Sequence, residues 1–150
     1  MNATELLKND HDKVKQLFEQ IKTNGADKTS LFRQIKTELD IHAHIEETIF
    51  YPYLLKNGDE DLQSITREGI EEHGEVKTTL QELSVMSGES EDFETQLSGL
   101  MDDVEHHVEE EEGEMFPMVE SQFDESVLDE LGTAMEKEKT SLQRSGSASA

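Results

Sequence analysis

Apolar residues recur along most of this chain at spacings of three and four, the period of an amphipathic α-helix. Four long stretches show the pattern, over about residues 4–23, 28–56, 59–85 and 91–119, and short breaks that contain glycine separate them. A weaker fifth segment covers about residues 124–143. No stretch alternates apolar and polar residues as a half-buried strand does. The pattern therefore predicts an all-α protein.

Capping residues and prolines mark the expected helix ends. Thr4 is the predicted N-cap of the first helix, and Asp27 or Ser30 can cap the second. Pro52 and Pro117 stand late in the second and fourth helices, where each removes a backbone donor, so a kink or an early end is expected there. Four long helices joined by short turns predict an antiparallel up-down-up-down four-helix bundle, with the fifth segment as a short extra C-terminal helix.

Six polar residues occupy core positions within these apolar stripes. They are His11, His42, Glu46, His73, His107 and Glu111. Residues four apart on a helix share one face, about 6 Å apart along the axis, so each of the two His/Glu pairs can hold one metal ion. A single histidine on an apolar face is more often a hydrogen-bonded core residue, but two unpaired buried carboxylates would be costly. Metal binding removes that conflict.

The two pairs belong to an internal repeat. Residues 42–52 read HAHIEETIFYP and residues 107–117 read HVEEEEGEMFP, and an offset of 65 superimposes a histidine, two glutamates, an aromatic residue and a proline. Upstream, residues 10–15 align with residues 72–77 at an offset of 62. Each half therefore supplies one isolated histidine and one His/Glu pair, a set that suits two metal ions.

Composition limits the compartment and the partners. The formal net charge of −23 argues against nucleic acid and anionic membrane surfaces as partners. No apolar run approaches the roughly 18 residues that span a bilayer, and the first residues lack the pattern of a signal peptide, so a cytoplasmic protein is expected. The chain contains no cysteine, which excludes a disulfide, a thiolate metal site and a cysteine nucleophile.

The length of 150 residues fits one domain. We expect this domain to cover residues 1–143. Residues 144–150 carry no apolar side chain larger than alanine, so they are predicted to form a disordered tail.

Histidine and carboxylate ligands without thiolate suit iron, manganese or zinc. Two carboxylates with room for a bridging oxygen suit a dinuclear iron or manganese centre. The residues alone leave the choice among these ions open.

In each copy of the repeat, an isolated histidine precedes an HxxxEE segment, which is followed by an aromatic residue and proline. This motif order resembles the hemerythrin-like family of HHE cation-binding domains. The resemblance covers about residues 6–117. It implies an antiparallel four-helix bundle around a non-haem di-iron site, bridged by two carboxylates and an oxo or hydroxo group. By the same resemblance the iron ligands are His11, His42, Glu46, His73, His107 and Glu111.

One position departs from the oxygen carriers of that family. Oxygen-carrying hemerythrins resemble one another in an HxxxH pair on the third helix, whereas Lys77 stands four residues after His73. One iron would then have an extra position for water, another side chain or substrate, which argues against simple reversible O2 carriage. The resemblance implies a protein that binds or processes O2, peroxide or NO, in oxidative or nitrosative stress or in iron and oxygen sensing. O2 binding or storage without turnover is the alternative, enzymatic activity is left open, and a metal-free interaction protein would leave the core carboxylates unexplained.

Several repeat residues outside the ligand set have two interpretations. Glu47 and Glu112 could orient ligand histidines or be solvated charges. Tyr51 and Phe116 are expected to pack at the end of the bundle more than to take part in redox chemistry, although a tyrosine near a metal that handles peroxide would merit a test. His44 and His106 are expected on the surface, because they point away from His42 and His107 on their helices. 

Overall fold

The structure is a computed structural model that describes residues 1–23 and 25–149, with side chains up to residue 145. Every regular element in this part of the chain is helical, so the all-α prediction is confirmed. In chain order the elements are α1 (Ala3–Ile21), α2 (Lys28–Ile45), η1 (Glu46–Phe50), α3 (Tyr51–Asn57), α4 (Glu60–Ser84), α5 (Glu91–Glu110), η2 (Glu111–Met115), α6 (Phe116–Gln122) and α7 (Glu125–Ser149). None of the described helices is long and apolar enough to cross a membrane.

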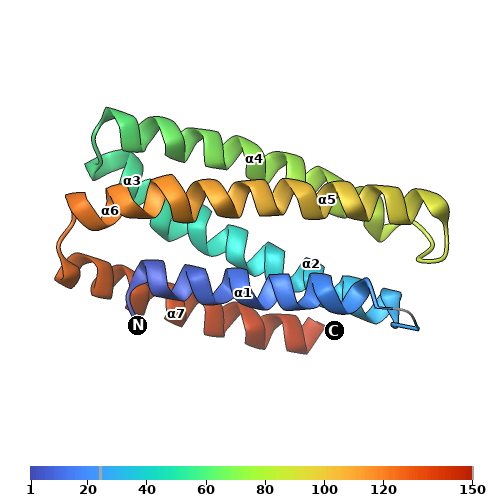
Figure 1. Cartoon of the computed structure of the whole chain (residues 1–150). Helices are drawn as coiled ribbons and strands as arrows, with labels where there is room; N and C mark the ends of the chain where they lie inside the picture. Colours follow the sequence, from blue (N-terminus) through green and yellow to red (C-terminus); the bar gives the residue numbers. More distant parts are fainter. Residues whose placement is uncertain (24, 150) are drawn as a thin grey trace.

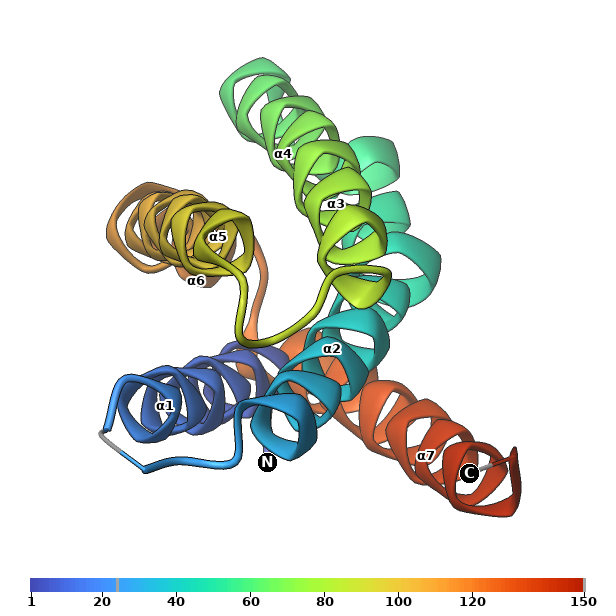
Figure 2. The same ribbon diagram turned by 90° about the vertical axis from the view of Figure 1, so that its right-hand side faces the viewer.

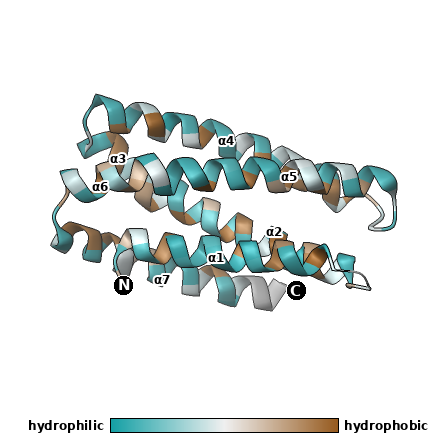
Figure 3. Cartoon of the chain, in the orientation of Figure 1, coloured by the Kyte–Doolittle hydropathy of each residue, from teal (hydrophilic) through white to brown (hydrophobic). Residues whose placement is uncertain are grey.

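The helices run along a common long axis (Figure 1). The chain passes along α1, returns through α2 and α3, passes again along α4 and returns through α5 and α6. The end-on view shows α7 outside this group, beside α2 (Figure 2), and α7 packs against both α1 and α2. Hydrophobic residues recur at intervals along each helix among hydrophilic ones (Figure 3), as the amphipathic pattern requires.

The helix starts follow the capping signals with one correction. Asn2, not Thr4, is the N-cap of α1, and its side chain accepts a hydrogen bond from the Glu5 backbone N–H. Thr4 is buried instead and donates its hydroxyl to Glu120 Oε1 at 3.2 Å. Asp27 caps α2 as predicted, by accepting from the Ser30 backbone N–H.

Of the two outcomes predicted at the prolines, the early helix end was wrong and the kink stays a prediction. The helices continue past Pro52 and Pro117, to Asn57 and Gln122. Each proline follows a short π-helical turn, and each π turn begins at a predicted ligand, Glu46 or Glu111. The irregular segment therefore starts among the polar residues of the core. The sequence predicts an irregularity only at the prolines, after those residues. Such turns occur often at functional sites.

The fifth helix is longer than the predicted cap. α7 has 25 residues, as many as α4, and lies along α1 and α2. It extends to Ser149, beyond the predicted end at Gln143. The side chains of residues 146–150 fall outside the described part, so the disordered tail of residues 144–150 stays a prediction.

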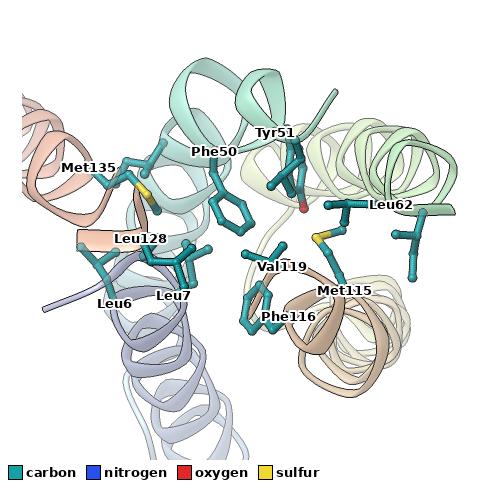
Figure 4. Close-up of a cluster of buried hydrophobic side chains, with 14 residues drawn as sticks. Leu6, Leu7, Phe50, Tyr51, Leu62, Met115, Phe116, Val119, Leu128 and Met135 are labelled. Atoms are coloured by element: carbon teal, nitrogen blue, oxygen red, sulfur yellow. The ribbon is translucent and has the colours of Figure 1, made fainter. Parts of the chain in front are cut away.

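Two apolar clusters occupy the two ends of the core. One contains Leu7, Ile45, Tyr51, Leu62 and Met115 with further residues of α6 and α7 (Figure 4), and the other contains Val14, Ile35, Leu80 and Val104 with their neighbours. On each of the four long helices a histidine lies in sequence between the residues of one cluster and those of the other. The polar layer is therefore enclosed between two apolar ones.

Candidate metal centre

All six predicted ligand residues come together in this polar layer. Glu46 and Glu111 are fully buried, and each of the four histidines is 6–7% exposed. The side chains form two groups whose possible ligand atoms lie within 4.8 Å of one another: His11, His42 and Glu111, and Glu46, His73 and His107. Each group is a set of two imidazoles and one carboxylate. Their role as metal ligands stays a prediction.

The two glutamates connect the two groups. Glu46 Oε1 lies 3.2 Å from His42 Nε2 and 3.0 Å from His73 Nε2. Glu111 Oε1 lies 3.0 Å from His11 Nε2, and its Oε2 lies 3.5 Å from His107 Nε2. Each carboxylate thus faces imidazoles of both groups, as a carboxylate that bridges two ions must.

Unpaired polar atoms test whether this layer fits a metal. His42 Nε2 and both carboxylate oxygens of Glu46 are buried and make no hydrogen bond of acceptable geometry, although Glu46 Oε1 lies within 3.2 Å of two imidazole nitrogens. A buried carboxylate that lacks partners costs several kcal/mol, and buried polar atoms are nearly always satisfied. A cation between these atoms removes the cost. The donor set of imidazole and carboxylate, without thiolate, fits iron, manganese or zinc.

A ring of outer carboxylates orients the four imidazoles. Each Nδ1 is bonded to an acidic side chain: His11 to Glu112 (2.7 Å), His42 to Asp10 (3.0 Å), His73 to Glu47 (2.8 Å) and His107 to Glu72 (2.6 Å). A carboxylate accepts from Nδ1–H, which leaves the lone pair of Nε2 directed inward for a metal. Of the two roles considered for Glu47 and Glu112, the structure shows the orienting one.

Sequence reasoning missed Asp10 and Glu72. Each precedes the isolated histidine of its half and bonds to the paired histidine on the following long helix, so Asp10 holds His42 and Glu72 holds His107. The signal was present in the repeat, because an acidic residue stands directly before the isolated histidine in both copies.

Tyr51 packs in the apolar cluster as expected, but its hydroxyl makes contacts that sequence reasoning did not predict. Its hydroxyl lies inside the centre, where it donates a hydrogen bond to Glu111 Oε2 and stands 3.4 Å from His73 Nε2 and 3.3 Å from His107 Nε2. The phenol oxygen is therefore a further candidate ligand in the group of Glu46, His73 and His107. The repeat counterpart, Phe116, packs parallel to His11 and offers no polar atom.

Burial and charge shift several pKa values in the metal-free centre. Burial alone would lower the pKa of His107, but the facing Glu111 carboxylate raises it to about 10. Burial would raise the pKa of Glu111, yet the charge of His107 and several hydrogen bonds hold it well below its usual range. The pKa of Tyr51 lies well above its usual value because of burial and the two nearby carboxylates, so the phenol keeps its proton.

A small cavity lies beside the four histidines. Its volume is about 40 Å³, and all four imidazoles contribute to its lining. The remaining wall is largely apolar, from Val14, Leu39, Val76, Leu80, Val104 and Val108. A wider groove of about 450 Å³ between α1 and α5 includes His11 and Glu112 in its lining. The centre thus has room for a molecule of a few atoms and a groove on one side.

Lys77 and the two remaining histidines lie outside the ligand layer. The Lys77 ammonium group pairs with Glu47 Oε1 at 2.6 Å, at the edge of the small cavity. His44 and His106 have side chains that are 44% and 64% exposed, in agreement with the surface interpretation.

The family model described as the hemerythrin HHE cation binding domain matches residues 2–119, well over half of the chain. The chain belongs to this family. The hemerythrin HHE match ends at the end of the predicted fourth helix, so α7 lies outside the residues that the family model matches. In a crystal structure of an HHE domain-containing protein from Mycobacterium kansasii, the fold is similar with a TM-score of 0.81 at 28% identity, and the alignment covers 97% of this chain and 89% of that one.

The curated relatives that this chain matches differ in length and in name. A protein named DNA nickase from Nostoc sp. is 28% identical over 147 residues, which are 96% of this chain and 41% of the relative. An uncharacterized hemerythrin-like protein of Schizosaccharomyces pombe is 27% identical, over 87% of this chain and 65% of its own length. An uncharacterized protein of Mycobacterium tuberculosis is 30% identical over 90% of this chain and 83% of the relative. The chain thus spans less than two thirds of the first two relatives.

Proposed function

We propose that this protein is a non-haem di-iron protein that binds or reacts with a small oxygen species, namely O2, hydrogen peroxide or NO. The proposal places it in the response to oxidative or nitrosative stress, or in iron and oxygen sensing, in the cytoplasm. It includes the antiparallel up-down-up-down order of the four long helices, which the path of the chain in Figure 1 and the hemerythrin-like neighbour support. The observation that carries the functional part is the apolar cavity beside the four histidines.

The size and lining of the cavity favour small neutral molecules. A space of about 40 Å³ admits a few water-sized groups and excludes larger organic substrates. Valine and leucine side chains cannot solvate an ion, so only Asp40, Lys77 and the histidines of the lining could compensate a charged substrate for its lost hydration. O2 and NO lose little on entering such a space, and peroxide is neutral at physiological pH.

The two groups of two histidines and one glutamate would hold the two ions. His11, His42 and Glu111 would hold one, and Glu46, His73 and His107 the other, with the Tyr51 phenol beside the second. Bound iron would supply the electrons for chemistry with oxygen species, which zinc cannot do. Support for iron over manganese comes from the family and not from the donor set.

The protein's own side chains would control protons around this centre. The outer carboxylates keep each Nδ1 protonated and each Nε2 free. The Tyr51 phenol holds its proton 3.3 Å from His107 Nε2, and hence next to any molecule bound at that side. Because its single O–H donates to Glu111 Oε2, the phenol would give a hydrogen bond to such a ligand only by leaving that carboxylate.

Lys77 favours a reactive or sensing protein over a reversible O2 carrier. The ammonium group cannot act as a ligand while protonated, and it is occupied by Glu47. One ion then keeps a position for an exogenous molecule. O2 storage without turnover is the alternative function.

The name of the Nostoc relative raises DNA as a substrate, but the match covers only part of that protein. The net charge of −23 opposes association with a polyanion. We therefore propose no nucleic-acid partner and no membrane partner.

The decisive experiment loads the full chain anaerobically with Fe(II) and records metal content and optical spectrum before and after O2, NO and peroxide. A Glu46→Gln/Glu111→Gln double variant is the control that should not retain two ions. Release of oxygen from peroxide with turnover supports an enzyme, and a stable spectral change without turnover supports the binding alternative. Failure of the wild-type chain to retain iron would overturn the proposal.

A further inference from the structure

Helix α7, which lies outside the residues matched by the family model, reaches the candidate metal centre through one side chain. Lys139 of α7 donates a hydrogen bond from Nζ to Asp10 Oδ1 at 2.5 Å. The other oxygen of the same carboxylate, Oδ2, lies 3.0 Å from Nδ1 of His42. Asp10 is only 4% exposed, so this chain of contacts is largely shielded from water. A residue outside the matched range 2–119 thus lies two contacts from a candidate ligand.

The position of Lys139 is fixed by the packing of α7. Leu128 and Met135 are buried in the same apolar cluster as Leu6 and Leu7 of α1 (Figure 4). Gly132 lies against the start of the chain so closely that a Cβ there would collide with the backbone of Met1 and Asn2. α7 therefore rests in one register on α1, with Lys139 two turns beyond Gly132.

We propose that Lys139 is a positioning residue for the ion held by His11, His42 and Glu111, and that α7 is a functional part of the metal centre. The ammonium group fixes the rotation of the Asp10 carboxylate and keeps its Oδ2 on His42. This inference rests on the proposed metal centre.

In the other half of the molecule, the repeat equivalent of Asp10 has no lysine clamp within the described residues, although Lys77 pairs with Glu47, the carboxylate bonded to His73. Glu72 is the repeat counterpart of Asp10 and holds His107, yet its ion pairs within the described part of the chain are with His107 and His106 only. The His106 side chain is 64% exposed and lies 3.7 Å away. The clamp therefore acts on one of the two ion positions, so loss of Lys139 should affect the two ions unequally.

The test is a titration of metal-free full-length protein with Zn²⁺ as a redox-inert probe, resolving the two equivalents by competition with a chelator. Lys139→Met should weaken one equivalent by about 10–100-fold, the usual effect of losing a partner that orients a ligand, and leave the other within about twofold. Lys137→Met, on the same helix, is the matched control and should change neither. Lys139→Arg should restore most of the affinity, because it keeps a donor cation.

A second pair of variants separates positioning from docking of α7. If Lys139 acts through Asp10, adding Lys139→Met to Asp10→Asn should cause little further loss. Equal weakening of both equivalents, or full additivity with Asp10→Asn, would assign the effect to helix docking and overturn the inference. Unchanged affinities in Lys139→Met would also overturn it. A wild-type chain that binds no Zn²⁺ would instead reject the metal centre itself.

Discussion

Tyr51 donates its hydroxyl to the Glu111 carboxylate, a residue 60 positions away on the opposite half of the repeat. This bond is the clearest difference between the halves, since Phe116 occupies the position of Tyr51 in the other copy. The halves share ligands and outer carboxylates but differ in the polar group next to them. The two ion positions are therefore chemically unequal.

Replacing Tyr51 with phenylalanine should remove a donor from buried Glu111 without opening a cavity. A hydrogen bond to a charged group contributes roughly 1.5–3 kcal/mol, so the free energy of unfolding of the metal-free protein should fall by about that amount. Urea unfolding measures it. Tyr53→Phe, at a partly buried tyrosine that packs against Phe123 away from the centre, should change the same quantity by less than about 0.5 kcal/mol. Equal effects of the two variants would contradict a role for the bond.

Gly69 provides the space for Tyr51 and His107. A Cβ at this position would stand 3.2 Å from Tyr51 Oη and 3.3 Å from His107 Cε1, so both groups would have to shift. Gly74→Ala on the same helix has nothing within 4 Å and should stabilise the protein by up to about 1 kcal/mol through helix propensity. Gly69→Ala should stabilise the protein by less than Gly74→Ala or should destabilise it, and it should lower the affinity for metal. Thermal melts and metal titrations of the two alanine variants measure these effects. Identical melting temperatures and metal affinities would show that Tyr51 and His107 do not need the space at Gly69.

The metal-free protein should lose stability as pH rises above neutrality. His107 has a pKa raised from 6.5 to about 10 in the fold, so its contribution is fully present below pH 6.5 and disappears as pH approaches 10. The expected loss is about 1.4 kcal/mol per pH unit within that window, measured by urea unfolding at pH 7, 8 and 9. The metal-loaded protein should be far less sensitive, because a ligand histidine is already neutral. A chelated protein that is equally stable at pH 7 and 9 would show that the His107–Glu111 pair contributes nothing.

Metal removal should lower the melting temperature. Binding stabilises the folded state by RT ln(1 + [L]/Kd), about 4 kcal/mol at a thousandfold excess of free metal over Kd. Calorimetry of chelated and reloaded protein tests this, and the Glu46→Gln/Glu111→Gln variant should melt alike under both conditions. Coincident curves for the wild type after verified removal would mean that the centre adds no stability.

Lys77→His should shift the centre toward reversible O2 binding. A histidine at the edge of the cavity would offer a neutral ligand where the wild type has an ammonium group. We expect slower reaction with peroxide and NO, by about tenfold or more, and a longer-lived O2 adduct in stopped-flow spectra. Lys77→Gln breaks the same Glu47 pair without adding a ligand, so it separates the two effects. If the wild type already forms a stable, reversible O2 adduct without turnover, the carrier function holds.

Sequence alone located the six residues of the polar layer because they fall on regular apolar stripes and recur in two copies. It did not place Tyr51, because five residues beyond Glu46 correspond to about 140° of rotation on a regular α-helix, away from the centre. The π turn over Glu46–Phe50 reduces that rotation, because a π turn holds more residues than an α turn, and the apolar period of the sequence does not reveal such a turn.

The contact between Lys139 and Asp10 could not be predicted from the sequence, for a different reason. The two residues are 129 positions apart, and Lys139 lies outside the repeat to which Asp10 belongs. Helical periodicity shows which face of α7 is apolar, but not the register in which that face docks. The backbone contact at Gly132 sets this register and is visible only in three dimensions.

The distribution of the ligands between the halves has a consequence for assembly. Each group combines two histidines from one helical hairpin with a glutamate from the other. Neither hairpin contains a complete site, so each ion would bind residues of both halves and would hold the two hairpins together. Severing the chain at the Gly58 turn should therefore yield two fragments that associate through the packing of α7 on α1 and α2, and that associate more tightly when metal is present.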